Sequence, residues 1–365
     1  MKLKDISKEI AILPPFKEHF SNKSFGSVSL YIRDINKKSK FKKTVNVYHN
    51  YIGPSYPGFK TVNLPRSLNH LIFGKNIGHT KSFIKYLKNN NKYPQIIEVH
   101  NRPKSAYLIS TKINLSKIFL FYHNDPLSFK DSSSLHFRKE LLNRCYKICF
   151  VSNFLKKRFM QDIPLTTVTK KKLHVIYNGV EPLVNKATRN KKIENIVYVG
   201  ELTKNKGFDI FLDAVVEIKS NFSKWQIDIF GKNHIKYSKD LNRYKNIKFH
   251  GFVNHDHVLQ FLNKSSISVI PSVWDEPFGR TLVESINANV ATISSTNGGL
   301  KEICKHFKVI KLNKINKKCI YNAIKKLIMS DHERTLYSDN NVSNSPFTLK
   351  KITSNLDLLR SKAIS

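Results

Sequence analysis

Short apolar runs alternate along the chain with longer stretches in which apolar residues recur every three or four positions. The short runs are rich in Val and Ile, which favours buried strands of a parallel sheet, whereas the longer period is typical of amphipathic helices. In the first half the pattern predicts strands at residues 10–13, 45–48, 96–99, 118–122, 148–151 and 175–177, and helices at residues 79–88, 136–143 and 153–159. This alternation indicates a doubly wound α/β domain.

The second half of the chain repeats the alternation. It predicts strands at residues 196–199, 226–230, 247–249, 267–270, 290–294 and 309–312, and helices that begin near residues 208, 277, 300, 319 and 349. One stretch near the N-terminus fits both patterns. Leu30, Tyr31 and Ile35 have helical spacing, whereas Val28, Leu30 and Ile32 alternate as in a strand.

A change of composition divides the chain near residue 182. The turn from Tyr177 to Pro182 is followed by a polar run from Asn185 to Lys192, and runs of this kind separate domains. With 365 residues the chain is long enough for two domains with separate cores. We therefore expect domains at residues 1–182 and 183–335, followed by a segment of residues 336–365 that holds the last helix.

The formal net charge of +37 suggests an anionic partner, and nucleic acid is one such partner. However, the lysines are spread along the whole chain, and Asn and Ile are also abundant, so drift toward A- and T-rich codons explains most of the charge. The rest of the positive charge is compatible with a contact with anionic lipid. The densest basic cluster, Lys37, Lys38, Lys40, Lys42 and Lys43, fits a solvated loop equally well.

Four cysteines provide no disulfide framework in a chain of this length. Cys145 and Cys149 are four residues apart at a predicted junction of helix and strand, which favours core packing over a metal pair. We therefore expect reduced thiols and a cytoplasmic location. The N-terminus does not read as a signal peptide, and we find no apolar run long enough to span a bilayer.

The most informative stretch for chemistry follows the predicted strand 267–270. Its loop carries Glu276 toward a helix, with Pro277 suited to the first helical position and Gly279 allowing a close approach of the backbone. Glu284 follows about two helical turns later, on the same side. Two carboxylates are therefore expected along one wall of a cleft.

A second loop, Thr296 to Gly299, follows the next predicted strand. Its Gly298 and Gly299 leave backbone amides bare, and such amides bind anionic or polar ligands. In an open parallel sheet, ligands bind at the carboxyl ends of the strands, where both loops lie. We expect the chemistry there.

Three patterns in this region together resemble the donor-sugar site of the retaining GT-B glycosyltransferases of family four. Residues 271–279 read P-S-x-x-x-E-P-F-G, Glu276 and Glu284 form an E-x7-E pair, and residues 295–302 read S-x-x-G-G-L-x-E. Their occurrence together and in order is more specific than any one of them. The resemblance implies two Rossmann-like domains that face each other across a cleft, with the last helix crossing back to the first domain.

The resemblance also implies roles for residues of the second domain. Glu276 would bind hydroxyls of the donor sugar near the reacting carbon, and Glu284 would hold the ribose hydroxyls. Lys206 would stabilise the leaving diphosphate, where a fixed cation lowers the barrier. The other residues implied at the donor are Gly200, Phe278, Gly279, Gly298 and Gly299, with Phe252 and Val253 near the nucleobase.

One position departs from the family pattern. Glu201 stands where an Arg is common, and its carboxylate would repel a diphosphate if it pointed inward. Arg280, in place of a common Leu, is our candidate for the missing guanidinium.

In the first domain the resemblance is weaker. The segment from Phe121 to Pro126 is similar to the one that holds a His facing the transferred sugar, which makes His123 the candidate; a satisfied core or loop histidine is an equal alternative. His100, Asn101 and Arg102 follow another predicted strand, and we assign them to the acceptor side. Gly26 precedes the stretch around Leu30 and is a further acceptor-side candidate.

The resemblance implies a retaining hexosyltransferase that moves a sugar from a UDP- or GDP-sugar to a glycan or lipid-linked acceptor in the synthesis of envelope polysaccharide or lipopolysaccharide. No Asp-x-Asp motif is present, so neither a metal nor another cofactor is expected to be required. The inner face of the plasma membrane is the expected site of a peripheral contact, and nucleic acid is not the expected partner. Two alternatives stay open: a basic nucleic-acid-binding protein, and a degenerate GT-B protein that binds sugar nucleotide or glycan without turnover.

Overall fold

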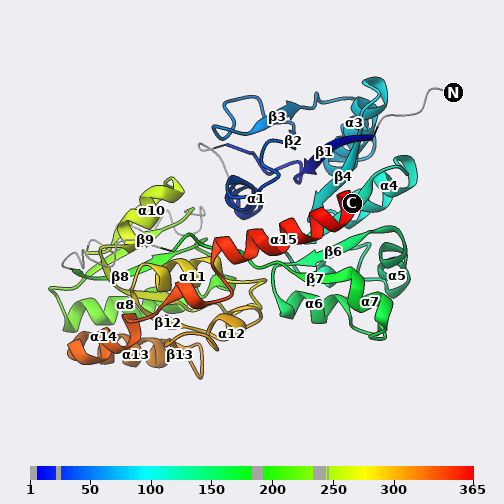
Figure 1. Cartoon of the computed structure of the whole chain (residues 1–365). Coiled ribbons are helices and arrows are strands. Elements are labelled where there is room, and N and C mark those ends of the chain that lie inside the picture. Colours follow the sequence, from blue (N-terminus) through cyan, green and yellow to red (C-terminus); the bar gives the residue numbers. More distant parts are fainter. Residues whose placement is uncertain (1–5, 22–25, 183–191, 233–243, 245) are drawn as a thin grey trace. The chain divides into compact units, whose positions relative to one another are not determined.

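The computed structural model describes residues 6–21, 26–182, 192–232, 244 and 246–365. The chain forms two compact units, each with its own parallel sheet (Figure 1). Unit 1 comprises Met1–Gly179 and Leu349–Ser365, and unit 2 comprises Val180–Thr348. The predicted class of two parallel-sheet α/β domains is confirmed. The boundaries lie at residues 179 and 348 instead of 182 and 335, and the polar run at 185–191 lies outside the described residues.

The sheet of unit 1 is entirely parallel, in the order β3-β2-β1-β4-β5-β6-β7. Its strands are β1 (Ile6–Leu13), β2 (Val45–His49), β3 (Lys60–Asn63), β4 (Tyr93–His100), β5 (Lys117–Tyr122), β6 (Lys147–Phe150) and β7 (Leu173–Val175). The chain adds strands to one side of β1 and then, from β4 onward, to the other. The sheet therefore has its topological switch point between β1 and β4, where ligands bind in folds of this class.

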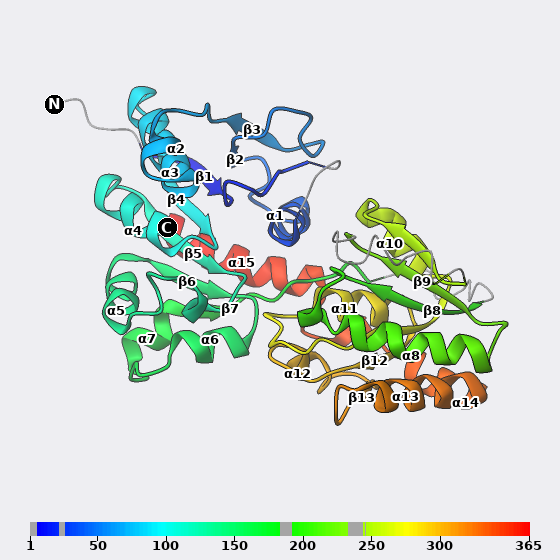
Figure 2. The same ribbon diagram turned by 180° about the vertical axis from the view of Figure 1, so that it is seen from behind.

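The helices of unit 1 cover this sheet (Figure 2). They are α1 (Ser27–Lys37), α2 (Asn69–Ile72), α3 (Lys75–Asn89), α4 (Pro103–Lys112), α5 (Leu135–Arg144), α6 (Asn153–Phe159), α7 (Thr167–Lys172) and α15 (Leu349–Ile364), with a 3-10 turn, η1 (Pro126–Ser128). The stretch that fitted both patterns is the helix α1. The core of unit 1 takes Val28, Tyr31, Ile32 and Ile35 from this stretch, at helical spacing. A strand would point the successive side chains of Tyr31 and Ile32 to opposite faces.

The last helix, α15, belongs to unit 1 although unit 2 precedes it in the sequence. Ile352, Leu356 and Leu359 join the unit 1 core, and the helix lies beside α1 and β4 (Figure 1). Arg360 is fully buried and donates to both carboxylate oxygens of Glu98 in β4, at 2.8 Å each. A bidentate pair of this kind fixes the register of the helix against the sheet.

The sheet of unit 2 is also parallel, in the order β10-β9-β8-β11-β12-β13. Its strands are β8 (Ile193–Val199), β9 (Gln226–Phe230), β10 (Lys248–Gly251), β11 (Ser265–Ile270), β12 (Ala291–Ser294) and β13 (Ile310–Lys311). The strand order reverses between β8 and β11. This is the switch point of unit 2.

The described helices of unit 2 are α8 (Phe208–Asn221), α10 (His255–Leu262), α11 (Arg280–Asn287), α12 (Leu300–Ile303), α13 (Lys317–Met329) and α14 (Asp331–Ser338), with 3-10 turns η2 (Lys204–Lys206) and η4 (Val342–Asn344). The prediction that Pro277 occupies the first helical position is wrong. Gly279 has a φ of 103°, which no right-handed helix accepts, so α11 begins only at Arg280.

Candidate functional site

Two loops meet at the switch point of unit 2, one after β8 and the other after β11. The carbonyl of Asn205 in the first loop accepts hydrogen bonds from the amides of Val273 (2.9 Å) and Trp274 (3.2 Å) in the second. Gly207 permits this approach, because it has a φ of 69° and a Cβ there would lie 2.0 Å from the carbonyl oxygen of Pro271. The glycine therefore brings Lys206 up to the end of β11.

Lys206 and Glu276 form an ion pair where these loops meet. The ammonium Nζ lies 2.7 Å from Oε1 and 2.9 Å from Oε2 of the carboxylate. Ser272 donates to the same Oε1 at 2.5 Å, and Glu276 is only 6% exposed. The sequence predicted both charged residues for the site but not that they contact each other.

The Gly298–Gly299 turn supports this carboxylate. The amide of Gly299 donates to the carbonyl of Glu276 at 2.6 Å, and Glu276 and Gly298 form a parallel bridge. Gly298 has a φ of 58°, and a Cβ there would lie 2.4 Å from that carbonyl oxygen. The expectation that the amide of Gly299 is bare toward a ligand is therefore wrong, because the turn uses it to hold the Glu276 loop.

Glu284, on α11, is the second buried carboxylate of the site. Its Oε1 accepts hydrogen bonds from Arg280 Nε (2.6 Å) and His255 Nε2 (2.7 Å). Burial raises the pKa of Glu284, but His255 and Arg280 outweigh it and lower that pKa to about 2. Glu284 is therefore ionised, and Arg280 is one of the groups that keep it so.

His255 and His257 both lie in the first turn of α10, but only one of them faces the core. His255 is buried, whereas His257 is exposed. The side chain of Asn254 caps α10. The buried positions of this helix, His255, Val258 and Leu262, follow helical spacing. That spacing was the signal in the sequence that could have placed His255 on the inner face.

The remaining donor-side residues lie in the loops of the same unit. Phe252 is half-exposed with Lys232 Nζ 5.0 Å from its ring centroid, whereas Val253 packs beside the Val197 and Phe230 cluster. Phe278 is buried 5.6 Å from the Phe347 ring.

Three further positions in these loops had been singled out in the sequence. The amide of Gly200 donates to the carbonyl of Phe230. A Cβ at Gly279 would lie 2.3 Å from Leu300. Glu201 is exposed, so water surrounds the charge that departs from the family pattern.

In unit 1, His100 and His123 form a buried pair at the ends of β4 and β5. His100 Nδ1 lies 2.9 Å from His123 Nε2, and the Asn101 side chain accepts hydrogen bonds from the amides of His123 and Asn124. Burial lowers the pKa of His123 to about 3, and burial and the neighbouring His123 hold that of His100 well below its usual range. Both rings are neutral, and one donates its hydrogen to the other.

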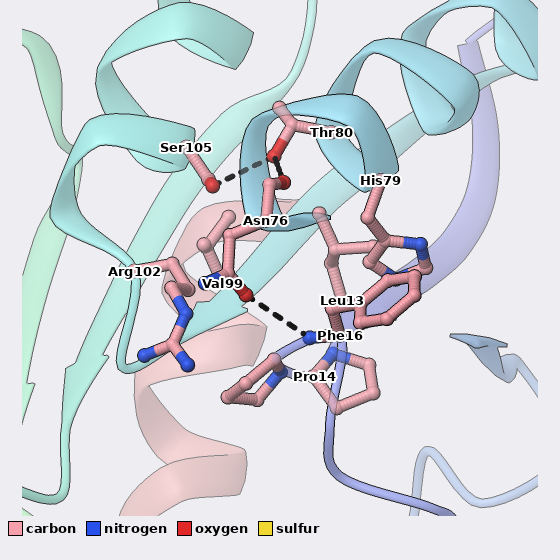
Figure 3. A pocket seen from close by; sticks show the side chains of 10 residues that line it. Leu13, Pro14, Phe16, Asn76, His79, Thr80, Val99, Arg102 and Ser105 are labelled. Carbon is pink, nitrogen blue, oxygen red and sulfur yellow. Dashed lines mark hydrogen bonds between the residues drawn. The ribbon is translucent and has the colours of Figure 1, made fainter. Parts of the chain in front are cut away.

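A small pocket opens at the switch point between β1 and β4 (Figure 3). Leu13 and Phe16 line it from the end of β1, His79 from α3, and Arg102 from the end of β4. Burial lowers the pKa of Arg102, and Glu18 opposes the shift. Burial also lowers the pKa of His79 to about 4. Arg102, which the sequence predicted for the acceptor side, therefore lines a pocket whose histidine is neutral.

Gly26 directly precedes α1. The carboxylate of Glu18 accepts a hydrogen bond from the amide of Ser29 in the first turn of this helix, at 3.3 Å. A Cβ at Gly26 would lie 2.4 Å from that carboxylate. Glu18 therefore already occupies the N-terminus of α1, beside the acceptor-side candidate Gly26.

Among the described residues, no group of three or more His, Cys, Asp or Glu side chains is placed to hold a metal ion. Cys145 and Cys149 are free thiols buried in unit 1, and burial raises the pKa of each. In the same part of the chain, no helix combines the length and the hydropathy that crossing a bilayer requires.

Comparison with known proteins gives concordant results. Residues 180–342, nearly all of unit 2, match the family model of glycosyl transferases group 1. An uncharacterized glycosyltransferase of Methanocaldococcus jannaschii is 27% identical over 76% of this chain and 77% of its own length. An uncharacterized 42.6 kDa protein in the cps region of Klebsiella pneumoniae is 28% identical over 42% of this chain and 39% of its own length. These matches support a glycosyltransferase.

Solved structures match nearly the whole chain. The Anabaena protein HepE in complex with UDP-glucose aligns with a TM-score of 0.75 at 16% identity, over 97% of this chain and 99% of the other. The lipopolysaccharide biosynthesis glycosyltransferase WaaG aligns with a TM-score of 0.70 at 12% identity, over 96% of this chain and 99% of the other. The GT-B fold of these neighbours is that of this chain.

Proposed function

We propose that this protein is a retaining glycosyltransferase that moves a hexose from a nucleotide-sugar to a glycan or lipid-linked acceptor of envelope polysaccharide synthesis. The observation that carries the proposal is the Lys206–Glu276 pair at the switch point of a unit that matches glycosyl transferases group 1. The acceptor class is supported by the relative encoded in a cps region and by the fold shared with WaaG.

In this proposal Lys206 acts on the leaving group. As the glycosidic bond to the nucleoside diphosphate breaks, negative charge grows on the phosphate oxygens, and a fixed cation stabilises it. Lys206 moves from Glu276 toward the diphosphate, where the backbone amides of Phe278 and Gly279 assist it. Glu276 then accepts hydrogen bonds from hydroxyls of the donor sugar. Because Lys206 supplies the positive charge, we propose that no divalent metal is required.

Glu284 binds the ribose. Arg280 and His255 both donate to Oε1, so Oε2 is left to accept from the vicinal hydroxyls of the nucleoside. A carboxylate held ionised at a pKa of about 2 is a stronger acceptor than a neutral one. Phe252, half-exposed in the loop after β10, is the candidate to contact the nucleobase.

Unit 1 holds the acceptor in this proposal. His123, Asn101 and Arg102 follow β4 and β5, and His100 fixes the ring of His123 at 2.9 Å. Because His123 is neutral, it contributes a hydrogen bond to the transferred sugar and no charge.

The test is a thermal-shift screen of UDP, GDP, ADP and CMP compounds against the wild type and Glu284→Gln. UDP is the first candidate, because HepE structures contain UDP and UDP-glucose. A ligand at a hundredfold excess over its Kd stabilises the folded state by about 2.7 kcal/mol. We expect a shift with one nucleotide that Glu284→Gln abolishes, and transfer with retained anomeric configuration by NMR.

Other outcomes separate the alternatives. Nucleotide binding without hydrolysis or transfer would identify a degenerate GT-B protein. A salt-sensitive shift with oligonucleotides and none with nucleotides would identify a nucleic-acid-binding protein.

A further inference from the structure

Four large apolar side chains of unit 1 lie exposed within six residues of sequence. Leu68, Leu71, Ile72 and Phe73 are 75%, 83%, 71% and 47% exposed. We call these four residues the α2 strip, because they lie on α2 and at its two ends. Single exposed apolar side chains are ordinary, but a contiguous group marks a surface that contacts a partner or a membrane.

The fold holds the α2 strip outward. His70, in the middle of α2, is buried, and its ring lies 5.3 Å from that of Phe16. The helix α2 lies against α3 (Figure 2), where a Cβ at Gly78 would lie 2.5 Å from the Cα of His70. Because His70 is buried and packs on Gly78 of α3, the apolar side chains of the α2 strip face solvent.

The stretch of sequence that carries the α2 strip has charged side chains of one sign. Residues 35–97 contain eleven Lys and one Arg but no Asp or Glu. Arg66 and Lys75 are exposed at the two ends of the strip, and Lys81 Nζ lies 2.9 Å from the centroid of the Phe73 ring. A surface of exposed apolar side chains bordered by cations complements a bilayer that contains anionic lipid.

We propose that the α2 strip docks this protein on an anionic membrane surface. Leu71 and Ile72 enter the boundary between headgroups and acyl chains, while Arg66 and Lys75 contact lipid phosphates. The docking itself does not depend on the proposed function, but the advantage of docking for sugar transfer rests on that function. Phe16, which contacts His70, also lines the pocket of Arg102, so docking brings the acceptor-side pocket close to a lipid-linked acceptor.

The experiment is co-sedimentation of the full chain with vesicles, either phosphatidylglycerol with phosphatidylcholine or phosphatidylcholine alone. The variant is Leu71→Gln with Ile72→Gln. The matched control is Leu165→Gln with Val168→Gln, because these side chains are 61% and 64% exposed elsewhere in unit 1. We expect binding to the anionic vesicles that falls about tenfold or more in the variant and is unchanged in the control.

Equal binding by the variant and the wild type would overturn the proposal. So would a wild type that forms dimers, binds no vesicles and becomes monomeric in the variant, since a second copy would then cover the α2 strip. Vesicle binding that depends on Leu71 and Ile72 in a protein without any nucleotide shift would support docking while the proposed function fails. The nucleotide shift of the variant should equal that of the wild type.

Discussion

Lys206 and Glu276 form an ion pair, and the proposed function gives each side chain a separate role. Glu276 is buried, and Lys206 is about a quarter exposed, so the proposed function assigns the movement toward a diphosphate to the lysine. Glu276 keeps the hydrogen bond from Ser272 when the lysine leaves. In the proposed function, Ser272 therefore keeps the carboxylate in place while Lys206 moves toward the charge that develops on the leaving group.

We predict that Lys206→Ala lowers the rate of transfer on the order of a hundredfold to a thousandfold, because one electrostatic contact to the leaving group is lost. The measurement is kcat with a saturating nucleotide-sugar. Lys204→Ala is the control, since Lys204 is an exposed lysine of the same 3-10 turn. Equal rates for the two variants would show that Lys206 has no role specific to the leaving group.

A second prediction concerns the charge of Glu284. With a folded pKa of about 2, below the ordinary 4.5, Glu284 contributes stability above pH 4.5 that is lost as the pH falls toward 2. In Arg280→Leu, burial is opposed by His255 alone, so the pKa of Glu284 rises. We expect the nucleotide affinity of the variant to fall between pH 7 and 5, where that of the wild type changes less.

Calorimetric titration of nucleotide between pH 8 and 4.5 makes this measurement. A loss of affinity in Arg280→Leu that is the same at every pH would instead place Arg280 on the diphosphate, as the sequence had suggested. The two contacts are therefore separable by the pH profile alone.

At the level of elements, the two loops of the switch point depend on the backbone of Gly207. Gly207 and Gly251 have nearly equal φ values, 69° and 68°, but only Gly207 has a neighbour at the place of a Cβ. The left-handed backbone costs an alanine about 1 to 2 kcal/mol at either position. At Gly207 the clash with the carbonyl of Pro271 adds to this cost.

We therefore predict that Gly207→Ala destabilises unit 2 by at least about 3 kcal/mol, whereas Gly251→Ala costs about 1 to 2 kcal/mol. Chemical denaturation followed by Trp225 fluorescence reports the difference, since Trp225 is buried in the unit 2 core. Similar losses for the two variants would mean that the loops shift to accept the methyl group.

Local pattern explains which elements the sequence could predict. Strands such as β5 and β11 are continuous apolar runs, and each predicted strand overlaps one in the structure. The strand β3 reads Lys-Thr-Val-Asn and the helix α2 buries one residue, so neither carries a periodic signal. These elements form because their neighbours supply partners, which a local pattern cannot show.

The same difference between local pattern and contacts across the fold applies to the candidate site. The family resemblance singled out Glu276, Glu284 and Lys206 as candidates, because each stands in a short motif of the sequence. It missed the hydrogen bond of His255 to Glu284 and the pairing of His100 with His123, since both join different elements across the fold. Contacts of that range depend on the strand order, and the alternation of strands and helices leaves that order open.

At the scale of the whole molecule, the chain returns to unit 1 after completing unit 2. The return buries Arg360 against Glu98, with Ser39 and Asp357 also near the guanidinium at 3.1 and 3.5 Å. A buried ion pair need not stabilise a fold relative to apolar residues, but one partner alone is costly. The two partners are 262 residues apart in the sequence, and their contact fixes the C-terminal helix on the sheet of unit 1.

We predict that Arg360→Met lowers the free energy of unfolding of unit 1 by about 3 to 5 kcal/mol, because the carboxylate of Glu98 stays buried without its partner. Glu98→Leu combined with Arg360→Met should recover most of this loss, since both charges are then removed. Differential scanning calorimetry, with the unit 2 transition assigned by its shift with nucleotide, measures unit 1 separately. If the double variant were as unstable as Arg360→Met, the contribution of Arg360 would lie in its contacts with Ser39 and Asp357 and in the packing of α15, and the Glu98 charge would be of minor importance.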